Sequence, residues 1–348
     1  MKAAVFSRPG IPLEIAEVPD PTPGPHELVL EVTACGICGS DLHASEIHDT
    51  SAGMHPLPPR TVMGHEFAGR VVAAGVQVRE AWPEGTRVTA LPFISCGDCA
   101  TCRAGRRDRC PHGAPLGLGR IPGAYAQFVR VGAYETLRLP ENVDDRVAAT
   151  VEPVAVGLHA VNVARPARGE SALVLGAGPI GLAVALWCRF FGMRHVVVTD
   201  LVPARLERAA EIGATGTVDA SGGDTIARVK ELAGERPTVV FDCVGVPGSQ
   251  QLAMDYAPME GRIVVAGVCM QPDRILPVKA VTKELQVNYV YAYRREDFVF
   301  AIDMLGAERI DPRPMISDVV GFDAFAQTFE ALKTDKNRCK VLLDPALS

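Results

Sequence analysis

The sequence lacks the features that mark nucleic-acid-binding, exported and membrane-spanning proteins. Its 35 lysines and arginines are outnumbered by 41 aspartates and glutamates, so the net charge of -6 offers no basic surface for nucleic acid. The first ten residues contain no apolar signal-peptide core. Residues 171–188 are uncharged and mostly apolar, but their central glycines and proline would break a membrane-spanning helix. We therefore expect a soluble, cytoplasmic protein that binds neither nucleic acid nor a membrane.

The composition is that of a globular protein with more than one domain. A chain of 348 residues exceeds what one hydrophobic core usually organises, so we expect two domains. Hydrophobic residues make up 48% of the chain, which argues against disorder. The ten cysteines occur without any sign of export, which disfavours a disulfide framework and favours metal binding.

Two patterns of hydrophobicity divide the chain. Up to about residue 140, short alternating runs such as 27–32 are broken by proline and glycine, which indicates an irregular, barrel-like β domain. From 171 to 290, apolar strands alternate with amphipathic helical segments such as 203–212 and 224–233, which predicts a doubly wound parallel sheet. We expect its six strands at 172–175, 195–199, 216–218, 238–242, 262–266 and 285–290.

The tail of the chain has a pattern of its own. Two helical patterns at 295–306 and 322–333 precede a last strand at 340–343, and we expect this tail to return to the first domain. The predicted fold is therefore α/β, with domains at 1–153 and 154–291 and a returning segment at 292–348.

One set of polar residues has the composition of an open zinc site. Cys38, His65 and Glu152 supply the thiolate, imidazole and carboxylate that hold a catalytic Zn²⁺ with one position left free. Taken alone, Glu152 would be an exposed helix start ahead of Pro153, where a carboxylate favours the helix dipole. With Cys38 and His65 present, we favour the metal. Side chains that can move a proton lie beside Cys38: Ser40, Asp41 and His43.

A redox role is the alternative for the Cys-x-x-Cys pair that Cys35 forms with Cys38. Such redox motifs lie in a thioredoxin-like βαβ setting, whereas this pair follows a strand into a polar, glycine-rich turn. We therefore expect Cys35 to be a small buried residue.

Four further cysteines lie within fifteen residues of one another: Cys96, Cys99, Cys102 and Cys110. Four thiolates in glycine-containing turns predict a closed, tetrahedral zinc site. Four arginines in the same loop would offset its negative charge. A zinc module for nucleic acid would use those arginines on phosphates, but it lacks a surrounding basic field.

A glycine-rich turn predicts the binding of a dinucleotide. Gly176-Ala-Gly178-Pro179-Ile180-Gly181 directly follows an apolar strand and opens a helix, and the next strand ends in Asp200. The glycines let the backbone approach a pyrophosphate at a helix N-terminus. Asp200 would accept the adenosine-ribose hydroxyls and repel a 2′-phosphate, which favours NAD. Arg205 is equally consistent with stacking on the adenine and with a solvated helix residue.

These motifs together resemble the zinc-dependent medium-chain alcohol dehydrogenases. The resemblance rests on Cys-Gly-x-Cys-Gly-Ser-Asp-x-His, Gly-His-Glu, the four-cysteine lobe, Glu-Pro and Gly-x-Gly-x-x-Gly, in that order over nearly the whole chain. It implies a GroES-like catalytic domain with a zinc lobe at 94–113, a Rossmann coenzyme domain and two zinc ions per chain. Glu152 stands where the alcohol dehydrogenases proper have a cysteine ligand, which resembles the polyol, butanediol and threonine dehydrogenase branch. In that branch, Glu66 alternates with Glu152 at the metal, directly or through water.

The resemblance also implies roles for the remaining residues. Ser40 takes the proton of the substrate and passes it through the nicotinamide ribose to His43, and Asp41 fixes the tautomer of His65. Backbone groups that follow two consecutive strands would meet the nicotinamide carboxamide: Val244, Gly245, Gly267 and Val268. Lys340 is equally consistent with a contact to the pyrophosphate and with a plain surface lysine.

The expected function is hydride transfer between NAD and a small-molecule secondary alcohol or ketone, with a diol, a polyol or a cyclic alcohol as the alcohol. L-Threonine 3-dehydrogenase is the alternative enzyme. A sensor that binds zinc and NAD without turnover would not need Ser40 and His43, and a crystallin-like structural protein would not need the open metal site. The apolar edge strand at 285–290 predicts pairing with a second copy, in a homodimer or a homotetramer.

Overall fold

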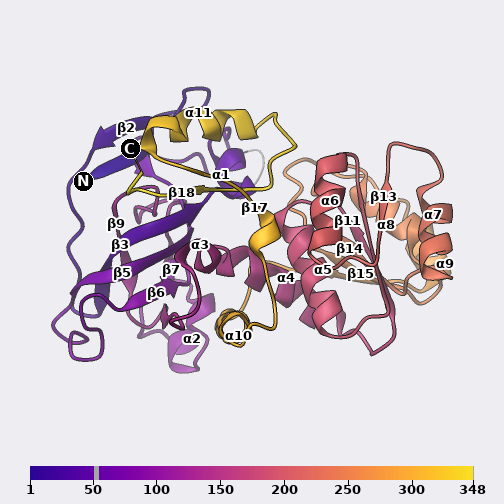
Figure 1. Ribbon diagram of the computed structural model, residues 1–348, viewed down its shortest axis with the longest axis horizontal. Coiled ribbons are helices and arrows are strands. Elements are labelled where there is room, and N and C mark those ends of the chain that lie inside the picture. The colour runs from indigo at the N-terminus through magenta and orange to yellow at the C-terminus, as the bar shows by residue number, and fades with distance from the viewer. Residues whose placement is uncertain (51–54, 348) are drawn as a thin grey trace. The chain divides into compact units, whose positions relative to one another are not determined.

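The computed structural model describes residues 1–50 and 55–347, and the chain forms two compact units (Figure 1). The first unit contains Met1–Glu152, Arg294–Gly306 and the chain from Ile316 on. The second contains Pro153–Tyr293 and Ala307–Met315. The chain therefore crosses between the units four times, and the short segment 307–315 belongs to the second unit, which the sequence did not indicate.

The first unit is built on one bulged sheet that is antiparallel except for the parallel pair β17 and β18. Its strands follow the order β10-β6-β5-β3-β18-β17, and β9 also pairs with β3. Two register shifts interrupt the pairing of β3 with β5 and bend the sheet. The strands of this sheet are β3 (Glu27–Gly36), β5 (Glu66–Ala74), β6 (Arg87–Ala90), β9 (Phe128–Gly132), β10 (Thr136–Arg138), β17 (Ile316–Val320) and β18 (Lys340–Leu343).

Smaller elements complete the first unit. Two minor sheets run β2-β1-β4 and β7-β8. Their strands are β1 (Lys2–Phe6), β2 (Glu14–Glu17), β4 (Thr61–Val62), β7 (Phe93–Ile94) and β8 (Ala114–Pro115). The helices are α1 (Gly39–Ala44), α2 (Ala100–Arg103), η1 (Arg107–Arg109), α3 (Asp145–Ala148), α10 (Arg295–Gly306) and α11 (Phe322–Leu332).

The core of the first unit joins the two ends of the chain. Helix α11 presents Phe322, Phe325 and Phe329 at helical spacing, and all three are fully buried against residues of β1 and β3. In Figure 1 the last strand, β18, lies beside β3, with which it pairs antiparallel. The tail thus lies in the sheet of the first unit.

The second unit has the predicted doubly wound sheet. Its six parallel strands follow the order β13-β12-β11-β14-β15-β16. All five residues of β11 are buried, as expected for a strand covered by helices on both faces. The strands are β11 (Ser171–Leu175), β12 (His195–Asp200), β13 (Gly216–Asp219), β14 (Val239–Asp242), β15 (Arg262–Val265) and β16 (Gln286–Tyr289). The predicted strand positions are confirmed to within one residue at every end.

Five helices connect these strands: α5 (Pro179–Phe190), α6 (Pro203–Glu211), α7 (Thr225–Ala233), α8 (Ser249–Tyr256) and α9 (Pro277–Lys283). Helix α4 (Val151–Ala164) precedes the sheet and begins in the last two residues of the first unit, and η2 (Arg313–Met315) follows the sheet. Among the described residues, none of the helices is both long enough and apolar enough to cross a membrane.

Candidate active site and metal centres

Three of the four predicted ligands of the open metal site lie together in the first unit. Potential ligand atoms of Cys38, His65 and Glu66 all lie within 4.8 Å of one another. Cys38 precedes α1 just after β3, and Glu66 opens β5, so the antiparallel pairing of β3 with β5 brings them together. A Cβ on Gly36 would lie 2.3 Å from Glu66 Oε2, so only glycine leaves room for this carboxylate.

Asp41 orients two of the ligands. Its Oδ1 lies 3.2 Å from His65 Nδ1, and its Oδ2 accepts a hydrogen bond of 3.2 Å from the backbone N–H of Cys38. Because Asp41 occupies Nδ1, the other ring nitrogen, Nε2, remains for a metal. Ser40 Oγ lies 3.4 Å from Nε2. A buried aspartate that fixes the imidazole of a ligand is the arrangement expected around a bound zinc.

The electrostatics of this cluster favour a cation. Burial alone would lower the pKa of His65, but the negative charges of Asp41 and Cys38 outweigh it and raise that pKa well above its usual value. The cluster therefore stabilises positive charge at this position. Zn²⁺ bound by sulfur, nitrogen and oxygen ligands would supply such a charge. The residues present therefore fit a zinc ion.

Glu66 is tied to a lysine far away in the sequence. Lys340 Nζ donates to both carboxylate oxygens, at 2.7 and 2.6 Å, and to the carbonyl oxygen of Ile37 at 2.9 Å. Both side chains are 1% exposed. Burial would lower the pKa of Lys340, but Glu66 raises it above its usual value. The predicted surface position of Lys340 was wrong, because the pairing of β18 with β3 buries its side chain against Glu66. A contact of Lys340 with the pyrophosphate stays a prediction.

Glu152 does not belong to the cluster of ligand atoms that the structure describes. It lies partly buried in the first turn of α4, where a carboxylate also interacts favourably with the helix dipole. As a ligand, Glu152 stays a prediction.

His43 is exposed near the end of α1, as required of a residue that exchanges protons with solvent. Partial burial of the ring and the nearby charge of Lys336 lower the pKa of His43 below its usual value. The imidazole is therefore neutral near pH 7 and able to accept a proton.

The four-cysteine cluster has the dimensions of a zinc tetrahedron. Four of the Sγ–Sγ distances among Cys96, Cys99, Cys102 and Cys110 are 3.4, 3.5, 3.8 and 3.9 Å. A tetrahedron with Zn–S bonds of about 2.3 Å has edges of about 3.8 Å. Backbone N–H groups of Asp98 and Cys99 point at Cys96 Sγ and lower its pKa to about 6, which favours the thiolate.

The arginines of this lobe are paired within it. Arg103 binds Asp98 at 2.8 Å, and Arg106 and Arg109 flank Asp108 at 3.6 and 3.4 Å. The guanidinium of Arg107 lies 4.1 Å from the ring centre of Tyr134. None of the ten cysteines forms a disulfide.

The glycine-rich turn in the second unit has the shape that a phosphate site requires. Gly176 has a φ of +90°, and a Cβ on Gly181 would lie 1.8 Å from the carbonyl oxygen of Gly176. Gly178 is the N-cap of α5 and Pro179 its first residue, followed by Ile180. Asp200 closes the turn, because its Oδ2 accepts from the N–H of Ala177 at 2.7 Å.

Four of the other predicted coenzyme residues follow the carboxyl ends of β14 and β15, and Arg205 lies in the first turn of α6. Arg205 Nη1 lies 3.7 Å from Asp200 Oδ2. A Cβ on Gly267 would lie 2.4 Å from the N atom of Gly245, so the loops after β14 and β15 are in close contact. Val244 and Val268, next to these glycines, are exposed.

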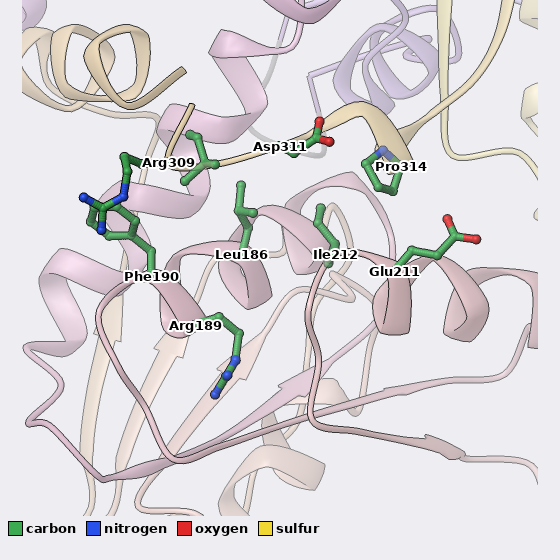
Figure 2. Close-up of a pocket in the computed structure, with 9 residues that line it drawn as sticks. Leu186, Arg189, Phe190, Glu211, Ile212, Arg309, Asp311 and Pro314 are labelled. Carbon is green, nitrogen blue, oxygen red and sulfur yellow. The ribbon is translucent and has the colours of Figure 1, made fainter. Parts of the chain in front are cut away.

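A separate pocket of about 320 Å³ lies on the second unit, between α5, α6 and the segment 307–315. Figure 2 shows Arg309 beside Phe190 at one end of it and Glu211 at the other. Its lining contains none of the residues predicted to bind metal or coenzyme: Leu186, Arg189, Phe190, Glu211, Ile212, Arg309, Ile310, Asp311 and Pro314.

The sequence missed two residues of the metal centre, Lys340 in its observed role and Tyr125. Tyr125 is fully buried, and its hydroxyl lies 2.5 Å from Asp41 Oδ2. No local motif marks either residue, because both reach the centre through contacts between distant segments.

Comparison with known proteins agrees with this geometry. Residues 24–141 match the alcohol dehydrogenase GroES-like domain, and residues 179–307 match the zinc-binding dehydrogenase family. An L-threonine 3-dehydrogenase of Aeromonas salmonicida is 33% identical over 345 residues, 99% of each chain. Two solved structures are similar over 99% of each chain. A zinc-binding dehydrogenase of Sinorhizobium meliloti bound to NADP has a TM-score of 0.89 and 31% sequence identity. A 2R,3R-butanediol dehydrogenase of Bacillus subtilis has a TM-score of 0.85 and 28% sequence identity.

The two ligand sets predict two zinc ions per chain with different roles. Elemental analysis of protein purified without chelator should give close to two. Cys38→Ser should remove about one zinc and leave the fold intact, because an open site does not support the core. Cys99→Ser should remove the other and lower the melting temperature, because closed zinc sites stabilise the local fold. If Cys38→Ser unfolds the protein and Cys99→Ser leaves the melting temperature unchanged, the assignment of the open and the closed site is reversed.

Proposed function

Because the chain belongs to the family of zinc-dependent medium-chain dehydrogenases and reductases, we propose that it transfers hydride between NAD and a secondary alcohol such as a diol, a polyol or a cyclic alcohol. Membership of this family makes the protein an oxidoreductase that uses zinc and a nicotinamide coenzyme. The observation that carries the proposal is the cluster of Cys38, His65 and Glu66, with Asp41 and Ser40 on the imidazole.

Cys38 and His65, with Glu66 or Glu152, would hold the catalytic zinc. The bound ion would lower the pKa of a substrate hydroxyl, and the nicotinamide would accept the hydride. Asp41 holds the ring of His65 through Nδ1, which keeps Nε2 directed at the metal. Lys340 balances the charge of Glu66, so that the buried carboxylate is not left unpaired beside the thiolate.

The proton of the substrate hydroxyl needs acceptors that lead to solvent. Ser40 stands next to the metal ligand His65, and its hydroxyl can accept a proton while it gives up its own. His43, three residues further along α1, is exposed and has a lowered pKa, so it is neutral near pH 7 and can release the proton to water. These two residues supply the general-base function that hydride loss from an alcohol requires.

The residues favour a secondary alcohol with a neighbouring oxygen. Carboxylates at Glu66 and Glu152 would offer oxygen acceptors for a water or a second substrate hydroxyl, whereas a cysteine ligand would be less polar. The similar Bacillus subtilis structure is a butanediol dehydrogenase, which supports this class. In the loop 44–63, few bulky apolar residues are present to form a long apolar channel, and its residues 51–54 lie outside the described part of the chain.

L-Threonine is the second candidate, and one observation favours it besides the name of the Aeromonas relative. Lys336 lies near enough to His43 to lower its pKa, and its ammonium would attract the carboxylate of an amino acid. Against threonine, Lys340 is committed to Glu66 and cannot serve as such a cation. A sensor without turnover would have no use for Ser40 and His43.

A substrate screen decides between these candidates. We expect NADH release with 2,3-butanediol, sorbitol or cyclohexanol to exceed that with ethanol or butan-1-ol by about 10- to 200-fold in kcat/KM, as one misplaced methyl in a pocket typically gives. Fastest turnover of threonine would establish the second candidate. Fastest turnover of a primary alcohol would contradict the inference drawn from the carboxylate ligands.

The proposed coenzyme is NAD rather than NADP. Asp200 uses Oδ2 for Ala177 and Oδ1 for the N–H of Val202, so its carboxylate is fixed at the end of β12. Arg205 faces Asp200, whose carboxylate partly neutralises the positive charge that a 2′-phosphate would need. The Sinorhizobium structure is bound to NADP, so the choice must come from this chain's own residues.

Coenzyme preference follows from the charge of Asp200. The 2′-phosphate would meet this carboxylate and leave hydrogen bonds unmade, a cost of roughly 2–4 kcal/mol or about 30- to 1000-fold in kcat/KM. Asp200→Asn should reduce that preference, whereas Glu207→Gln, which removes an exposed charge from the same helix as Arg205, should not. Equal kcat/KM for both coenzymes in the unmodified protein would refute the assignment.

The proposed assembly is a homodimer, or a homotetramer built from it, formed at the edge of the second unit. Strand β16 is the last strand of the sheet, and Tyr289 on it is 67% exposed. Helix α9 adds Val278 and Val281, which are 58% and 72% exposed. A bare apolar edge strand is a liability that pairing with a second copy removes.

Light scattering at micromolar concentration tests this assembly. Val278→Asp combined with Val281→Asp should reduce the mass to that of one chain, because two buried carboxylates would oppose association. Val76→Asp, at a residue of the first unit that is also 67% exposed, is the matched control and should leave the mass unchanged. A monomeric mass for the unmodified protein would exclude the assembly.

A further inference from the structure

Tyr125 reaches the metal centre with its hydroxyl, its ring and its backbone. The side chain is 0% exposed, and its hydroxyl lies 2.5 Å from Asp41 Oδ2 and 3.3 Å from the carbonyl oxygen of Gly36. A phenol has a single proton to donate, and the carboxylate is both the nearer and the stronger acceptor. The hydroxyl therefore holds one oxygen of Asp41.

The carboxylate that Tyr125 holds is the one that orients two metal ligands. Asp41 receives Cys38 N–H on Oδ2 and faces His65 Nδ1 with Oδ1, each at 3.2 Å. Because Asp41 is fully buried, water does not supply substitute hydrogen bonds. Rotation of this carboxylate would move its contacts with both ligands at once.

The backbone around Tyr125 fixes the residue that precedes His65. Tyr125 N–H donates to Met63 O at 2.9 Å, and Ala124 N–H donates to Gly64 O at 2.9 Å. Gly64 has a φ of +95°, and a Cβ there would lie 2.4 Å from Tyr125 Cδ1, so the ring packs directly on its backbone. The other side of the ring contacts Phe325, with ring centres 4.8 Å apart.

We propose that Tyr125 is a positioning residue of the catalytic metal centre, whose hydroxyl fixes Asp41 and through it the orientation of His65 and Cys38. The proposal rests on the zinc site of the proposed function. A buried tyrosine needs an acceptor in any core. Here, however, the acceptor is a carboxylate that contacts two predicted ligands, so loss of the hydroxyl should weaken metal binding as well as the fold.

Tyr125→Phe tests the role of the hydroxyl while it keeps the ring between Gly64 and Phe325. We expect the affinity of the open site for Zn²⁺, measured by chelator competition, to fall by about 10- to 100-fold, as is typical when a group that supports a metal ligand is lost. The absorption spectrum of the Co²⁺-substituted protein should also change. Tyr293→Phe, at a buried tyrosine of the second unit, should leave both readouts unchanged.

A double-mutant cycle shows whether Tyr125 acts through Asp41. Asp41→Asn alone should weaken Zn²⁺ binding, and adding Tyr125→Phe should weaken it little further, because contacting residues are not additive. Additive losses would overturn the assignment, as would a Tyr125→Phe protein with a lower melting temperature but unchanged Zn²⁺ affinity and Co²⁺ spectrum. Failure of the proposed function is separately visible, because Cys38→Ser would then bind as much zinc as the unmodified protein.

Discussion

The buried ion pair between Glu66 and Lys340 is the interaction on which the metal centre depends. Glu66 follows the predicted metal ligand His65 at the start of β5, and Lys340 opens the last strand of the chain, 274 residues later. A buried charge that loses its partner costs several kcal/mol, so neither residue is stable in this place without the other. The first unit therefore completes its metal centre only when β18 has joined β3.

The two metal sites differ in how local their construction is. All four cysteines of the lobe lie within fifteen residues, and one short helix with two turns arranges them. The open site takes its predicted ligands from the turn between β3 and α1 and from the start of β5. Its charge balance comes from the last strand, and a hydrogen bond to Asp41 comes from Tyr125. The local site therefore depends on one loop, whereas the dispersed site can be tuned by residues from several segments.

Sequence reasoning succeeded wherever spacing along the chain carries the chemistry. The positions of the six parallel strands were predictable because buried strands alternate with helices at regular intervals, and the glycine turn because only glycine tolerates the contact between Gly176 and Gly181. The role of Lys340 was not predictable, because it follows from the register of β18 on β3. The role of Tyr125 was not predictable for the same reason, since a lone tyrosine in an apolar stretch is typical of a core residue. The segment 307–315 carries no pattern that assigns it to the second unit.

Because the chain crosses between the units four times, a chimera of two family members needs more than one pair of junctions. Consider a chimera whose coenzyme unit is exchanged at one pair of junctions, near Glu152 and Tyr293. Its segment 307–315 would come from one family member and the rest of the same unit from the other. That segment supplies Ile310, which is buried, and Pro314, whose carbonyl oxygen accepts from Arg208 on α6. A modular exchange must therefore carry two separate stretches of the chain. The second unit is one compact body, but two separate segments of the coding sequence encode it.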